Sequence, residues 1–146
     1  MPGFTTPHRG PVSTLIGTET SYSRTVSEYD VYGFAGISGD NHPNHIDEEY
    51  CNRVGLRARV AQGAMLVGYM AGAVTKYLGL IERPAVSYGY DRVRFTKSVF
   101  IGDTLTIHYQ IVRADDEKKR AWANATLTNQ HGEVVSVGTH IIHFQE

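Results

Sequence analysis

The feature that most restricts the fold is an apolar helical segment near the middle of the chain. Residues 64–78 contain one charged residue, Lys76, and a glycine stands at each end, Gly63 and Gly79. A helix that is apolar on every side is normally buried, and a plain core helix would satisfy that condition. Because the segment is also rich in alanine and glycine, other backbone can approach it closely. We therefore expect a sheet that curls around this helix.

Alternation of apolar and polar residues marks the second half of the chain and predicts antiparallel strands. The alternation slips near Asp91, where we expect a β-bulge. With one strand before the helix, five strands are predicted: 21–25, 86–95, 104–111, 121–127 and 134–144. One buried helix and about five strands indicate an α+β domain, with an antiparallel sheet wrapped around a central helix.

Length, charge and cysteine content narrow the class of protein. A chain of 146 residues fits one domain over 1–146, and the prolines and glycines of 1–14 predict an extended N-terminal arm. The net charge of −1, without a long run of one sign, argues against nucleic acid or an anionic membrane as partner. The single cysteine, Cys51, excludes an intrachain disulfide and indicates a reducing cytoplasm. No segment predicts a signal peptide or a membrane span.

Between the first strand and the apolar helix, the chain is rich in turn-forming residues. A capping serine predicts a helix over 27–34 that ends by Gly39. Residues 37–47 are expected to form a polar loop, because a regular element cannot continue through Pro43. A short helix is expected over 47–53.

The polar loop holds a carboxylate and an imidazole five positions apart, at Asp40 and His45. Such a pair can hold one water from two sides and move protons near neutral pH. At the start of the apolar helix, the N–H of Gly63 would suit a carbonyl oxygen that becomes negative, because the helix dipole favours that charge. A glycine kept for tight packing fits the same position equally well.

Two short motifs resemble the signature of the MaoC-like (R)-specific enoyl-CoA hydratases, a family with the hotdog fold. The first, over 36–47, contains the run Ser-Gly-Asp-Asn-His-Pro-Asn-His, in which Asp40 and His45 match the family's catalytic pair. The second, over 60–66, reads Val-Ala-Gln-Gly-Ala-Met-Leu. The resemblance extends over about 21–144.

The resemblance implies a hydro-lyase of the (R)-3-hydroxyacyl-CoA dehydratase type, which adds water reversibly across the α,β double bond of an acyl thioester. Asp40 and His45 would hold the water, and the N–H of Gly63 would hold the enolate oxygen. The substrate would be a thioester of CoA or of acyl carrier protein in fatty acid metabolism. Neither a metal nor a redox cofactor would be required, and the protein would form a homodimer.

Five further residues are candidates for binding the substrate. His42 stands where many family members have asparagine, and Gln62 replaces the histidine of a usual Ala-His-Gly run, so both can alter substrate choice. Tyr88 fits an acyl pocket or a packed sheet face. Arg94 and Lys97 could meet the phosphates of CoA, or could belong to a solvated strand face.

Three other functions are compatible with parts of the sequence. Asp40, His42, His45 and Asp47 are all acceptable metal ligands within eight residues. The same fold could also bind acyl-CoA without chemistry. A hotdog thioesterase often relies on a carboxylate on its central helix, and residues 64–78 contain neither aspartate nor glutamate.

Overall fold

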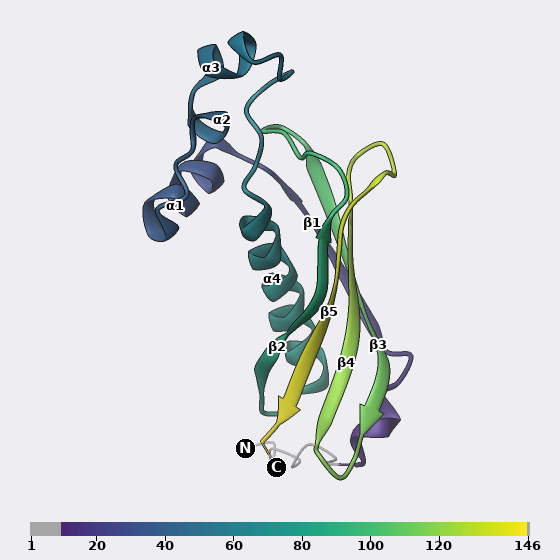
Figure 1. Cartoon of the computed structure of the whole chain (residues 1–146). Helices are drawn as coiled ribbons and strands as arrows, with labels where there is room; N and C mark the ends of the chain where they lie inside the picture. The colour runs from purple at the N-terminus through teal and green to yellow at the C-terminus, as the bar shows by residue number, and fades with distance from the viewer. Residues whose placement is uncertain (1–9, 146) are drawn as a thin grey trace, which may run out of the picture.

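A five-stranded antiparallel sheet curves around one long helix in the computed structural model, which describes residues 10–145 (Figure 1). The strand order across the sheet is β1-β3-β4-β5-β2. This arrangement confirms the predicted α+β architecture and is that of a hotdog fold. The elements are η1 (Val12–Leu15), β1 (Glu19–Thr25), α1 (Glu28–Ser38), α2 (Pro43–Ile46), α3 (Glu48–Arg53), α4 (Gly63–Ile81), β2 (Ala85–Phe95), β3 (Thr104–Asp115), β4 (Arg120–Thr128) and β5 (Val134–Phe144).

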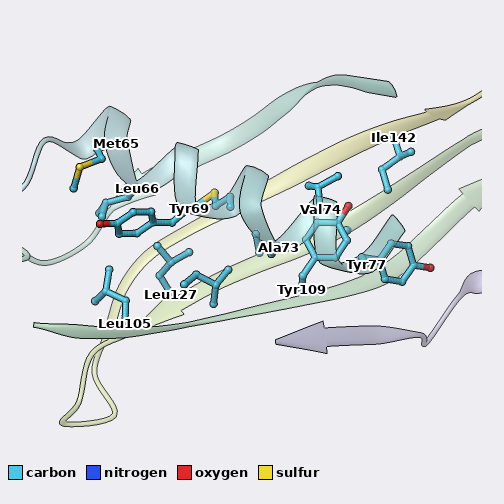
Figure 2. Close-up of a cluster of buried hydrophobic side chains, with 14 of the residues drawn as sticks. Met65, Leu66, Tyr69, Ala73, Val74, Tyr77, Leu105, Tyr109, Leu127 and Ile142 are labelled. Atoms are coloured by element: carbon cyan, nitrogen blue, oxygen red, sulfur yellow. The ribbon is translucent and has the colours of Figure 1, made fainter. Parts of the chain in front are cut away.

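The core lies between α4 and the concave face of the sheet. Figure 2 shows the helix directing its apolar side chains toward residues of β3, β4 and β5, among them Leu105, Leu127 and Ile142. The helix is not buried on every side, however, because a stripe of small residues including Ala64, Gly68 and Ala71 is exposed or nearly so. The buried residues of α4 are Met65, Leu66, Tyr69, Met70, Ala73, Val74 and Tyr77.

Helix α4 continues beyond the predicted stop at Gly79. It ends at Ile81, and Glu82 in the left-handed conformation (φ 50°) caps it through an N–H bond to the carbonyl oxygen of Leu78. An interior glycine costs only about 1 kcal/mol, and the packing of Ile81 against the core opposes that cost. By length and composition α4 could also cross a membrane, but its packing on the sheet is that of a core helix.

The edge strand β2 is irregular where it pairs with β5. Its register shifts between Ser87 and Gly89, and again between Asp91 and Arg94, which confirms the predicted bulge. Arg92, inside the second irregularity, has a left-handed φ of 53°. The other side of β2 pairs with no strand within residues 10–145.

The segment α1 to α3 gathers at the N-terminal end of α4 (Figure 1). A capping box between Ser27 and Asp30 begins α1, and Gly39 (φ 78°) ends it, which confirms the predicted capping serine and the predicted end by Gly39. The expected loop is confirmed for residues 39–42 and is wrong for residues 43–46, because proline is favoured at the first helical position and here opens the one-turn helix α2. Asp47 caps α3 as the sequence predicts.

The described part of the predicted N-terminal arm contains one helical turn. Residues 1–9 of the predicted arm lie outside the described residues. Within the rest, Val12 and Leu15 are buried in the core, and they place one turn of 3₁₀ helix against the sheet. The prediction of an extended arm is therefore wrong for residues 12–14, where apolar burial favours a turn.

One histidine lies fully buried beneath α4. His140 on β5 has its Nδ1 atom 2.7 Å from the Tyr109 hydroxyl and its Nε2 atom 2.7 Å from the Ser87 hydroxyl. Burial lowers the pKa of His140 to about 4, because a charged imidazole would lose its hydration there. The ring is therefore neutral at physiological pH.

Candidate active site

The side chains of Asp40 and His45 face each other at the N-terminal end of α4, and we call them the Asp–His pair. The Nε2 atom of His45 lies 3.6 Å from the Oδ1 atom of Asp40. This distance is too long for a direct hydrogen bond, but short enough for both atoms to contact one water. His45 is buried, whereas the Asp40 carboxylate is partly exposed, so solvent reaches the pair from one side.

The backbone fixes the ring of His45. Its Nδ1 atom lies 2.6 Å from the carbonyl oxygen of Val60. A carbonyl oxygen can only accept a hydrogen bond, so Nδ1 carries the proton and donates. In the neutral ring, Nε2 is then the acceptor, and it is the atom that faces Asp40. The pair therefore offers two acceptors to the two protons of one water.

Val60 also holds the helix that carries His45. The N–H of Val60 donates to the carbonyl oxygen of Asn44 (3.0 Å), while its own carbonyl accepts from His45. An isolated β-bridge joins Val60 to Phe100 in the segment between β2 and β3. The sequence gives no side-chain signal for this role, because it belongs to a backbone carbonyl.

Gly63 is the first residue of α4, as the proposed oxyanion role requires. No acceptor among the described residues pairs with its N–H. The position also needs glycine for packing, because a Cβ here would lie 2.6 Å from the ring of Phe95. The structure thus supplies a packing reason for this glycine, separate from the proposed oxyanion role. Phe95 was not among the residues singled out from the sequence.

Gln62 lies beside the Asp–His pair but points inward. It is fully buried, and its Nε2 atom donates to the carbonyl oxygens of Val31 (2.9 Å) and Asp40 (3.3 Å). The side chain of Gln62 therefore contacts the backbone of Asp40 and is not exposed at the surface.

His42 lies next to the pair as the sequence suggested. It caps α2, with Nδ1 accepting from the N–H of Asn44 (3.3 Å), and its ring centre is 6.4 Å from that of His45. Asp47, the fourth of the proposed metal ligands, accepts from the N–H of Tyr50 and caps α3. Within residues 10–145, no group of three or more metal-ligating side chains is gathered in one place.

The other three predicted binding residues do not contact the Asp–His pair. The guanidinium of Arg120 lies 3.8 Å from the ring centre of Tyr88, and Arg120 alternates with buried residues of β4, so both side chains lie on the sheet face away from α4. Arg94 donates to the carbonyl oxygen of Val93 (2.7 Å). Lys97 forms an ion pair with Glu133.

A separate apolar cavity of about 530 Å³ lies between α1, β1 and α4. Its walls include Phe34, Ile37, Met65 and Gly68, and a network of Arg24, Asp30 and Tyr69 lies at its edge. Neither member of the Asp–His pair lines this cavity.

Comparison with known proteins adds independent information about this arrangement. The family described as "MaoC like domain" matches residues 13–135. An (R)-specific enoyl-CoA hydratase of Rhodospirillum rubrum is 32% identical over 122 residues, which are 84% of this chain and 82% of that protein. A 3-hydroxybutyryl-CoA dehydratase of Methylorubrum extorquens is 30% identical over 107 residues, 73% of this chain and 66% of that protein.

Solved structures agree on the fold. The (R)-hydratase of Aeromonas caviae has a TM-score of 0.81 at 20% identity and covers 89% of this chain and 96% of its own. An R-hydratase of Pseudomonas aeruginosa has a TM-score of 0.77 at 25% identity, and the match covers 93% of this chain and 86% of that protein. With the family match over most of the sequence and relatives of about one-third identity, the chain belongs to the MaoC-like dehydratase family.

Proposed function

We propose that this protein reversibly hydrates an α,β-unsaturated acyl thioester, as a hydro-lyase of the (R)-3-hydroxyacyl-CoA dehydratase type. The observation that carries the proposal is the orientation of His45, whose Nδ1 is held by Val60 so that Nε2 faces the Asp40 carboxylate at 3.6 Å. The names of the two relatives of about one-third identity, a hydratase and a dehydratase, support the same class of reaction.

In the hydration direction, one water donates its protons to Asp40 and His45. The pair removes one of these protons while the water oxygen forms a bond to Cβ of the substrate, and the π electrons move onto the thioester to give an enolate. The proton then passes from the pair to Cα on the same face, so that one O–H bond breaks and one C–H bond forms. We assign the base to the pair and not to one residue, because both acceptors would contact the same water.

The enolate oxygen is proposed to accept a hydrogen bond from the N–H of Gly63. This donor has no partner among the described residues, and it lies at the positive end of the dipole of α4. CoA or acyl carrier protein would serve as the handle of the substrate, and this reaction requires no metal or redox cofactor. Arg94 and Lys97 remain candidates for its phosphates.

Two alternative functions, a thioesterase and a non-catalytic acyl-CoA-binding protein, differ from the proposed hydratase in what they do to the thioester. A thioesterase would release a free thiol, and α4 contains no aspartate or glutamate to assist it. A non-catalytic member of the fold would bind acyl-CoA and leave it unchanged. The buried free thiol of Cys51 fits the cytoplasm as the proposed location.

We also propose that two copies pair through β2. One side of this strand is without a strand partner among residues 10–145, and it carries the exposed apolar side chains of Val86 and Phe95. An unpaired apolar edge is a liability unless another strand or layer covers it.

Incubation with crotonyl-CoA tests the proposed reaction. The hydratase proposal expects loss of the enoyl thioester absorbance and formation of the (R)-3-hydroxyacyl product without release of free CoA thiol. Release of free thiol would instead indicate a thioesterase. Tight binding of acyl-CoA with neither change would indicate the non-catalytic alternative.

A further inference from the structure

We infer that Gln62 is a positioning residue, which holds Asp40 in place through the backbone. The inference rests on the proposed hydratase function and adds a role that the motif itself does not assign. Gln62 ends the segment before α4 and immediately precedes the proposed oxyanion donor, Gly63. Its side chain is fully buried, so it acts through protein contacts.

The amide of Gln62 joins three parts of the site. Its Nε2 atom donates to the carbonyl oxygen of Val31 in α1 and to that of Asp40, at 2.9 and 3.3 Å. Its own backbone leads directly into α4. The carboxylate residue, the helix before it and the proposed oxyanion donor are therefore connected by one side chain.

The orientation of this amide follows from its neighbours. Val31 and Asp40 both present carbonyl oxygens, which accept hydrogen bonds and repel another oxygen. The NH₂ end must face them, because the reversed amide would place its oxygen against both. The Oε1 atom is left buried without a hydrogen-bond partner among the described residues.

The backbone contact matters because little else holds Asp40. Its N–H donates to the hydroxyl of Ser38 (3.1 Å), while among the described residues its carboxylate meets only His45, at 3.6 Å. The position of the carboxylate is thus set mainly by where the backbone of Asp40 lies. Gly39, in the left-handed conformation, directly precedes it and has no side chain to pack.

A purely apolar side chain would fill the same space without a buried unpaired oxygen. An unsatisfied buried acceptor is unfavourable for folding, so packing alone gives no reason for glutamine here. The two donated hydrogen bonds do give a reason. They place Gln62 as a support for the geometry of the Asp–His pair.

Replacement by methionine tests this role, since methionine is similar in length and lacks the donor. Gln62→Met should lower kcat for crotonyl-CoA hydration by about 10²-fold with little change in KM, because small misplacements of a reacting group have effects of that size. The matched control is Gln130→Met in the β4–β5 turn, where an amide also bonds two neighbours, Thr104 and Asp103. The control should retain the parent kcat.

Two further variants separate positioning from folding. In Gln62→Glu, only the protonated acid can donate, so its kcat relative to the parent should rise as the pH falls from 8 to 5. Gln62→His keeps an N–H donor and should restore most of the turnover lost in Gln62→Met. Each kcat is compared on protein that circular dichroism shows to be folded at the pH of the assay, because an ionised glutamate buried at position 62 would also weaken the fold.

The outcomes distinguish this inference from the function on which it rests. If the parent protein and an Asp40→Asn variant behave as the hydratase proposal expects, and Gln62→Met keeps the parent kcat, the positioning role is overturned. The same holds if Gln62→Glu shows a constant ratio to the parent across pH. If the parent itself does not hydrate the substrate, the proposed function fails first.

Discussion

Replacing Gly63 by alanine should disturb the start of α4 although the backbone N–H remains. The new Cβ would lie 2.6 Å from the Phe95 ring, well inside the ordinary carbon contact distance of about 3.5–4.0 Å. The ring or the helix start must therefore move by about 1 Å. Overpacking of this kind costs about 1–3 kcal/mol of unfolding free energy. A shift of about 1 Å near the reacting atoms can also cost about 10²-fold in turnover.

Removing the Phe95 ring separates this packing effect from the proposed chemistry. In a Phe95→Ala background, Gly63→Ala should show little further loss, since it retains the donor. Gly63→Pro lacks the donor and should lower turnover by about 10²- to 10³-fold, about 3–4 kcal/mol. Proline is tolerated at the first helical position, and Gln62 before it already has the extended φ of −62° and ψ of 133° that such a residue adopts.

The assay is crotonyl-CoA hydration together with urea unfolding for each variant of the cycle. A folded Phe95→Ala/Gly63→Pro protein that turns over as fast as Phe95→Ala alone would refute the oxyanion role of Gly63. A Gly63→Ala protein as stable and as active as the parent would refute the packing estimate.

The remaining predictions concern stability and assembly. Burial lowers the pKa of His140 from 6.5 to about 4. The free energy of unfolding should therefore be highest above pH 6.5, and it should decrease by roughly 3 kcal/mol as the pH falls toward 4. Urea unfolding from pH 7 to pH 4 should show this decrease in the parent and in the control variant His131→Gln, which changes an exposed turn. His140→Gln should show a smaller decrease. Equal decreases in all three proteins would contradict the role of His140. Pairing through β2 predicts a light-scattering mass twice the 16.2 kDa of one chain at micromolar concentration, whereas a monomer mass would contradict it.

Much of the fold could be predicted because its signals are local. Ser27 and Asp47 cap the helices that follow them, and the slipped alternation near Asp91 marks an irregular strand. One error occurs where packing outweighs a local preference, and another where the preference of proline for the first helical position outweighs the loop signal around it. Helix α4 passes through Gly79 because Ile81 packs beyond it, and Pro43 begins a helix although its position in a polar run suggested a loop.

The candidate site could be predicted only in part. The motif places Asp40 and His45 close in sequence, and the structure places their side chains 3.6 Å apart. The carbonyl of Val60 and the ring of Phe95 reach the site through tertiary contacts that leave no periodic pattern in the sequence. Tyr88 lies on the outer face of the sheet, beside a register shift that changes which side chains of β2 point inward. The alternation of apolar and polar residues does not show at which residue such a shift occurs.

The central claim is that Asp40 and His45 act together on one water, and the hydration rate of Asp40→Asn tests it most directly. Asparagine keeps the size of the side chain but cannot take up a proton. We expect turnover of crotonyl-CoA to fall by about 10²- to 10⁴-fold, the usual contribution of a general acid or base. The matched variant Asp115→Asn, in the distant β3–β4 hairpin, should keep the parent rate. Near-parent turnover by a folded Asp40→Asn protein would contradict the account.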